Sequence, residues 1–197
     1  MIDSKMEFPE NPFWDFAIEV YRRDGVGEAC LALQEHHGVD VNVLLFCCWL
    51  GASGRGALDD GRMARLVKTV EPWQDDVVRG LRAVRAAMKD GVDAAPRDWS
   101  DALRARIAAT EIDSEHIEHF MLVADTADLA AGEAIAMEQR LSHAMANAGR
   151  YFACRGIKAT AADIAPLTTV FAAAFPELGR EVVAGITESL GSAPLLG

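Results

Sequence analysis

Apolar residues recur at every third or fourth position along most of this chain, the spacing of helices with one buried face. The clearest example is the segment 73–88, in which Trp73, Val77, Leu81 and Val84 fall on one helical face. Runs that alternate apolar with polar residues, which would predict strands, do not recur. The sequence therefore predicts an all-α protein with seven to nine helices.

Capping residues indicate where these helices begin and end. Asn11 is suited to cap the first helix and Asp40 the third, while Thr160 and Asp163 have the spacing of a capping box. We expect Pro72 to interrupt the fourth helix. The expected helices cover residues 13–23, 26–37, 40–49, 59–71, 73–88, 101–124, 128–153, 160–175 and 178–190.

Length and composition indicate one folded domain. The 197 residues suit a single domain over residues 1–197, with an N-terminal helical half at 13–90 and a C-terminal half at 98–190. Apolar residues make up 51% of the chain and charged residues 25%, which excludes wholesale disorder.

Charge, the termini and the cysteines restrict location and partners. A net charge of −11 argues against nucleic acid as a partner, because phosphate binding depends on Lys and Arg. The longest apolar run, residues 41–50, is shorter than the roughly 20 residues of a membrane-spanning helix. The N-terminal residues carry no secretory signal, so we expect a cytoplasmic protein away from membranes. The four cysteines lack CxxC spacing and are expected to be buried, reduced thiols: Cys30, Cys47, Cys48 and Cys154.

A glycine-rich stretch, residues 51–57, has two interpretations. It follows an apolar run and precedes a helix, and Asp75 and Asp76 lie about 20 residues further on, as in a dinucleotide-binding strand–turn–helix unit. However, no second parallel strand follows, and Asp40 with Asn42 favours a helix start. We therefore expect a plain loop between helices, and the dinucleotide interpretation fails if residues 41–50 are helical.

Several polar residues stand out as candidates for binding a ligand or a partner. Arg79, Arg82 and Arg85 recur every third residue, and form either a solvated face or a docking surface for an anionic ligand or an acidic partner. Glu111, Glu115 and His119 share a second face, with Glu118 and His116 expected off it. Asn42 lies in an apolar run and needs hydrogen-bond partners if it is buried. The candidate binding residues are His37, Asn42, Trp73, Arg82, Arg85, Glu111 and Glu115.

The order of residues in the first two thirds of the chain resembles an uncharacterised proteobacterial family of small helical proteins, a domain of unknown function. The similarity covers about residues 13–120 and rests on Phe13-Trp14-Asp15-Phe16-Ala17, Tyr21, Gly25-Val26, Cys30-Leu31, Leu33-Gln34, Gly38-Val39-Asp40-Val41-Asn42, Leu44-Leu45-Phe46, Trp49-Leu50, Trp73, Leu81-Arg82, Arg85, Glu111-Ile112 and Glu115. The resemblance implies a cytoplasmic bacterial protein with no assigned activity, and a helix from Asp40 to Leu50.

These patterns favour a non-enzymatic helical protein that acts by binding another protein, with a regulatory role and a homodimer as options. No catalytic set, cofactor or metal is assigned, because no Gly-x-Ser-x-Gly or paired Glu-x-x-His motif occurs. The alternative is an enzyme that binds a small ligand or metal within a helical bundle. Arg82 and Arg85 would then clamp an anion, and Glu111, Glu115 and His119 would act as acid–base or metal groups. Whether those last three bind a metal stays open.

Overall fold

The computed structural model describes residues 6–91, 95–132 and 134–192, and these form helices and connecting loops without a strand. Side chains are described as far as residue 187. Along the chain the elements are α1 (Pro12–Tyr21), α2 (Val26–His37), α3 (Val41–Ala52), α4 (Asp60–Trp73), the π-helix η1 (Gln74–Val78), α5 (Arg79–Ala87), α6 (Arg97–Asp125), α7 (Met137–Cys154), α8 (Ala161–Ala174) and α9 (Arg180–Ser192). Among these elements, no helix has the length and apolar character needed to span a membrane. The predicted all-α fold is confirmed.

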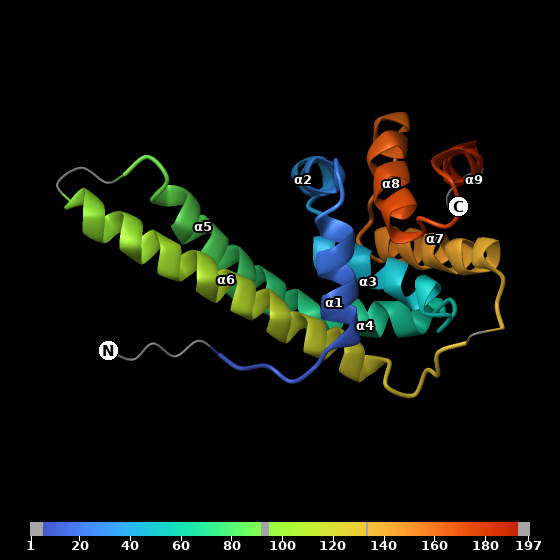
Figure 1. Cartoon of the computed structure of the whole chain (residues 1–197), viewed down its shortest axis with the longest axis horizontal. Helices are drawn as coiled ribbons and strands as arrows, with labels where there is room; N and C mark the ends of the chain where they lie inside the picture. The colour runs from blue at the N-terminus through green and yellow to red at the C-terminus, as the bar shows by residue number, and fades with distance from the viewer. Residues whose placement is uncertain (1–5, 92–94, 133, 193–197) are drawn as a thin grey trace.

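The helices form a body from which one long hairpin projects (Figure 1). The hairpin consists of α5 and α6, which lie side by side, and α4 leads into α5 through η1. In the body, α3 packs against α7, and α2 packs against α8. Helix α1 crosses α6 where the hairpin joins the body. This junction brings together elements far apart in the sequence.

Capping residues set most helix boundaries as predicted. The Asn11 carboxamide accepts hydrogen bonds from two backbone N–H groups of the first turn of α1. Helix α2 ends at Gly38, whose φ of 67° is the left-handed conformation that glycine adopts without strain. Asp40 caps α3, and Thr160 with Asp163 forms the capping box of α8.

Several predicted boundaries are wrong, and α6 begins at Arg97 instead of residue 101. Helix α4 passes through Pro72 and continues as η1 and α5, so the proline does not interrupt the rod. Proline lacks a backbone N–H, so one hydrogen bond of the helix is missing. A π-helical turn after the proline is one way in which a helix continues despite the missing bond. The seventh helix begins at Met137 instead of residue 128, although the intervening residues include good helix formers.

The predicted amphipathic segment 73–88 is also less buried than expected. Only Gln74 and Val78 are buried in η1, no residue of α5 is buried, and Val84 is 51% exposed. Because α5 lies in the projecting hairpin, α6 covers one of its sides and the body covers little of the rest.

The dry core of the protein lies between α3 and α7. Residues 43–51 of α3 are all buried, and a Cβ atom on Gly51 would lie 2.5 Å from the Arg140 carbonyl oxygen on α7. Gly54 likewise contacts the backbone of Gly132. The glycine-rich stretch thus allows close packing, and because residues 41–52 are helical, the dinucleotide-binding unit is excluded.

Three of the four cysteines match the prediction of buried thiols. Cys30, Cys47 and Cys48 are buried and unpaired with one another, and burial raises the pKa of Cys30 to about 12. Cys154 is exposed, which corrects the prediction for that residue. It is the last residue of α7.

Candidate functional site

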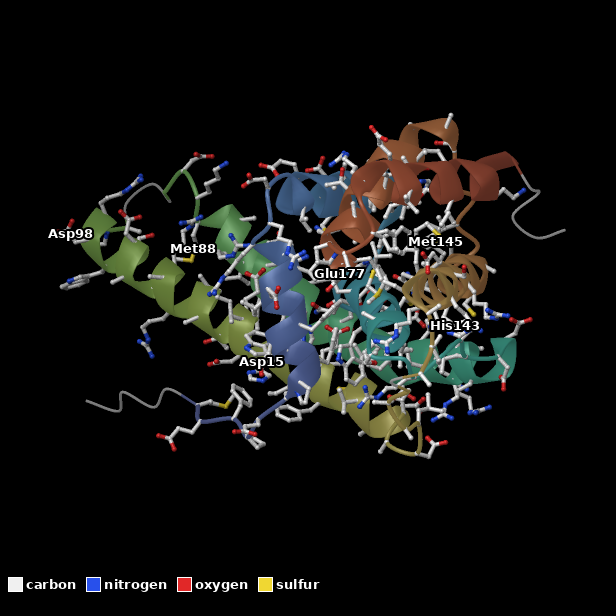
Figure 2. The ribbon with its side chains drawn as sticks, turned by 45° about the vertical axis from the view of Figure 1, so that its right-hand side comes forward. Asp15, Met88, Asp98, His143, Met145 and Glu177 are labelled. Carbon is white, nitrogen blue, oxygen red and sulfur yellow. The ribbon has the colours of Figure 1, made fainter. Side chains whose placement is uncertain are left out.

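A cavity of about 380 Å³ lies where the hairpin joins the body. It is bounded by α1, α2, the start of α3, η1, α5 and α6. Figure 2 shows α1, which carries the labelled Asp15, lying across the hairpin. Apolar atoms form much of the wall. The apolar and aromatic lining residues are Trp14, Ala17, Ile18, Tyr21, Cys30, Leu31, Val41, Leu45 and Ile112, and the polar ones are Gln34, Asp40, Asn42, Gln74, Arg82, Arg85, Glu111, Glu115 and His119.

Two arginines of α5 and two glutamates of α6 form a paired cluster on one side of the cavity. Arg82 donates from Nε to Glu111 at 2.9 Å and from Nη2 to Glu115 at 2.8 Å, and its Nη1 donates to Gln34 of α2 at 2.7 Å. Arg85 donates from Nε to the other Glu111 oxygen at 2.5 Å. Because protein carboxylates already occupy both guanidinium groups, the arginines fix the glutamates and tie the hairpin to α2.

Burial affects the two glutamates differently. For Glu111, burial acts to raise the pKa, but hydrogen bonds from Arg85 and Arg82 outweigh it and leave the pKa below its usual range. For Glu115, burial raises the pKa, and the hydrogen bond from Arg82 does not offset it. The pKa values of the two carboxyl groups in this cluster are therefore shifted in opposite directions.

A second polar network crosses from α3 to α6. The Asn42 Nδ2 donates to Glu118 Oε2 at 2.9 Å, and the Asn42 Oδ1 lies 3.0 Å from His119 Nε2. Burial, together with the negative charge of Asp40, raises the pKa of Glu118 to about 10. Burial likewise raises the pKa of Asp40. Glu118 therefore holds a proton at neutral pH beside Asp40.

The hydrogen bonds of Asn42 fix the protonation of His119. Burial lowers the pKa of His119 to about 3, so its ring is neutral. With the Asn42 amide in this orientation, its oxygen accepts from the N–H of His119 Nε2, and Nδ1 carries a lone pair. The ring stacks on Phe13 with the centroids 4.1 Å apart. His119 thus offers a fixed, neutral hydrogen-bond acceptor.

Two buried acceptors at the cavity have no partner among the residues that the structure describes. They are Oε1 of Gln74, in η1, and Nδ1 of His119. Both side chains are buried, and an unpaired buried polar group costs about 1–3 kcal/mol. The π-helical turn that carries Gln74 is itself a feature enriched at functional sites.

The structure brings most of the predicted candidates together. Asn42, Arg82, Arg85, Glu111 and Glu115 all line the cavity, although they come from three helices. Two candidates lie elsewhere. His37, the last residue of α2, contacts Asp163 of α8. Trp73 donates from Nε1 to the Ser114 carbonyl oxygen at 3.0 Å.

Sequence reasoning missed three polar lining residues, Gln34, Asp40 and Gln74, and the buried Glu118 beside the cavity. Gln74 precedes two aspartates and reads as a surface residue, and Asp40 was assigned only a capping role. Glu118 was expected off the face of Glu111 and Glu115, but its side chain is fully buried. The spacing of Glu111, Glu115, Glu118 and Leu122 is that of one helical face, a signal that could have found it.

The three residues considered as metal ligands on α6 are engaged otherwise. Glu111 and Glu115 accept from arginines, and His119 Nε2 bonds to Asn42. In the described part of the chain, nitrogen and oxygen ligand atoms gather instead at His36, His37 and Asp163.

The fold and the cavity define this molecule as an all-helical protein with a polar network beside an apolar-walled cavity. The chain belongs to the family described as "Protein of unknown function (DUF2390)", which it matches over residues 12–122. That range contains the entire cavity lining. No curated protein and no solved structure matches the chain.

Proposed function

We propose that this protein binds a small organic molecule in the cavity at the hairpin junction. The observation that carries the proposal is the pair of unpartnered buried acceptors, Gln74 Oε1 and His119 Nδ1, beside an apolar wall. A volume of about 380 Å³ is in the range of small-molecule sites. Protein binding was the first expectation from the sequence, and the cavity moves our preference to the alternative.

The cavity walls indicate the chemistry of this molecule. Two unpaired acceptors need hydrogen-bond donors, so the ligand carries N–H or O–H groups. The arginines are already paired with Glu111 and Glu115, which leaves little to attract a free anion. The wall formed by Trp14 and Leu45 suits an apolar portion. If the ligand is also converted, His119 is a lining group whose unpaired Nδ1 can accept a proton from it.

Ligand-observed NMR with matched fragments tests this proposal. Benzyl alcohol and aniline are neutral and carry donors, whereas anisole is neutral and offers an acceptor alone on the same ring. We expect saturation transfer to the first two and none to anisole, and loss of the signal in Gln74→Met. The control Gln139→Met removes an exposed glutamine on α7 and should keep the signal. Equal binding of anisole, no binding of either donor fragment, or binding unchanged by Gln74→Met would overturn the proposal.

Protein binding, including formation of a homodimer, is our second proposal. The supporting observation is the exposed apolar surface at the free end of the hairpin, which Asp98 marks in Figure 2. There Trp99 is 77% exposed, and Leu103, one turn further along α6, is also exposed. Sedimentation velocity at micromolar concentration tests self-association: we expect dimers, and monomers for Trp99→Gln. A monomeric wild-type protein would contradict the dimer.

We also propose that the protein works in the cytoplasm, because its cysteines are unpaired thiols and three of them are buried. Fractionation of native cells followed by immunodetection checks this, and recovery with membranes or outside the cell would contradict it.

A further inference from the structure

Two histidines at the end of α2 meet an aspartate at the start of α8. His36 Nδ1 lies 3.2 Å from Asp163 Oδ1, and His37 Nε2 lies 2.9 Å from Asp163 Oδ2. One ligand atom from each side chain can be chosen so that all three lie within 4.8 Å of one another. None of these residues lines the cavity. We propose that His36, His37 and Asp163 bind a divalent transition-metal ion, with zinc as the expected occupant.

The distances between these atoms suit such an ion after small adjustments. Zinc holds nitrogen and oxygen ligands at about 2.0–2.1 Å in a tetrahedron, which separates neighbouring ligand atoms by about 3.4 Å. The observed separations of 2.9 and 3.2 Å between the imidazole nitrogens and the carboxylate are close to this value. Rotation of the imidazoles by a small angle would open the centre of the group for the ion.

Hydrogen bonds from Thr160 hold the Asp163 carboxylate in place, as neighbouring groups do for carboxylates that bind metals. Its Oδ2 accepts hydrogen bonds from the backbone N–H of Thr160 at 2.6 Å and from the Thr160 hydroxyl at 2.9 Å. These bonds hold the carboxylate and leave Oδ1 directed at His36. Hydrogen bonds of this kind to a ligating carboxylate raise metal affinity because they fix its position.

Exposure and charge favour an ion at this place. The Asp163 side chain is 3% exposed, whereas that of His36 is 55% exposed, so one side of the group is open to solvent. An ion held by three protein ligands with a water in the fourth position has this arrangement. Two imidazoles with one carboxylate favour zinc and related transition ions over magnesium and calcium, which prefer oxygen alone.

Such an ion would add a link between two parts of the chain that already meet through packing and hydrogen bonds. His36 and His37 lie inside the family match at residues 12–122, and Asp163 lies beyond it. A metal at this position would therefore clamp α8 and the C-terminal helices to the matched part.

Isothermal titration of untagged, chelator-treated protein with zinc chloride tests the proposal. We expect one ion per chain with a micromolar or lower Kd, and at least a roughly tenfold weaker Kd in His36→Ala and His37→Ala. His36 is the decisive position, because its exposed side chain can be shortened with little effect on folding. The control His143→Ala removes a histidine of α7 and should leave the Kd unchanged.

Cobalt(II) provides a second measurement of the same site. We expect visible absorption bands typical of a four-coordinate ion, lost in His36→Ala while far-ultraviolet circular dichroism stays the same. Magnesium chloride should neither bind nor compete. Absence of zinc binding in the wild-type protein, or an unchanged Kd in both single-histidine variants, would overturn the proposal, and neither result bears on the cavity.

Discussion

Helix α3 borders two buried regions, which differ in whether a buried side-chain amide has hydrogen-bond partners. In the dry core between α3 and α7, Asn147 is fully buried, accepts from the Leu58 N–H at 2.8 Å and donates to the Gly56 carbonyl at 3.1 Å. At the cavity, Gln74 is also buried, but its Oε1 has no hydrogen-bond partner in the described part of the protein. Because native proteins pair nearly all buried polar groups, the contrast supports the proposal that the cavity binds a molecule.

Packing in the dry core offers the largest expected effect. In Gly51→Ala the new methyl group would lie 2.5 Å from the Arg140 carbonyl oxygen and 2.7 Å from Ala144, so α3 and α7 must separate. We expect the free energy of unfolding to fall by about 3 kcal/mol. Urea denaturation followed by circular dichroism measures this.

Gly149, on the partner helix α7, is the matched control. A Cβ atom there meets nothing within 4 Å, so Gly149→Ala should stabilise the protein by about 0.5–1 kcal/mol through helix propensity. Equal losses in the two variants would show that close packing of α3 on α7 is not the constraint.

A paired polar group in the core should be costly to remove. Asn147→Leu leaves the Leu58 N–H and the Gly56 carbonyl without their partner. We expect a loss of about 2–3 kcal/mol in the free energy of unfolding, measured by urea denaturation. A loss below about 0.5 kcal/mol would mean that water replaces the amide, and the contrast with the cavity would weaken.

The buried carboxyl pair predicts a dependence on pH. The pKa of Glu118 is raised to about 10 in the folded state, above about 4.3 in an unfolded chain, so folding takes up a proton between these values. The stability that Glu118 contributes is therefore present in full below pH 4 and is lost as the pH rises toward 10. Asp40, whose pKa is also raised, acts in the same direction.

Glu118→Gln removes this titration and keeps a group that accepts from Asn42. We expect the variant to exceed the wild type in stability by about 1–2 kcal/mol at pH 8, and by less at pH 5. Urea denaturation at pH 5, 7 and 8 gives both curves. Parallel curves would show that Glu118 is ionised in the folded protein.

The smallest effect on stability is expected at the cavity itself. Gln74→Met keeps the side chain close to its original length and removes an acceptor that is already unpaired, so stability should stay the same or rise by up to about 1 kcal/mol. Thermal denaturation checks this beside Asn147→Leu. A loss as large as that of Asn147→Leu would mean that Gln74 is paired, and the central argument for a ligand would fail.

The sequence determined the local structure of this protein. Helix-period spacing, the caps at Asn11 and Asp40 and the glycine at position 38 act within a few residues, and the structure has them as predicted. Pro72 shows the limit of such signals. Its local preference against a helix interior was overridden by the helix on both sides of it.

Only the tertiary structure decided which polar residues form a site. Asn42 and Glu118 are 76 residues apart, and the positions of α3 and α6 alone bring them into contact. The burial that raises the pKa of Glu118 and leaves Gln74 unpaired is likewise a property of packed helices. Periodicity indicates which residues share a helical face, whereas long-range packing determines what that face meets.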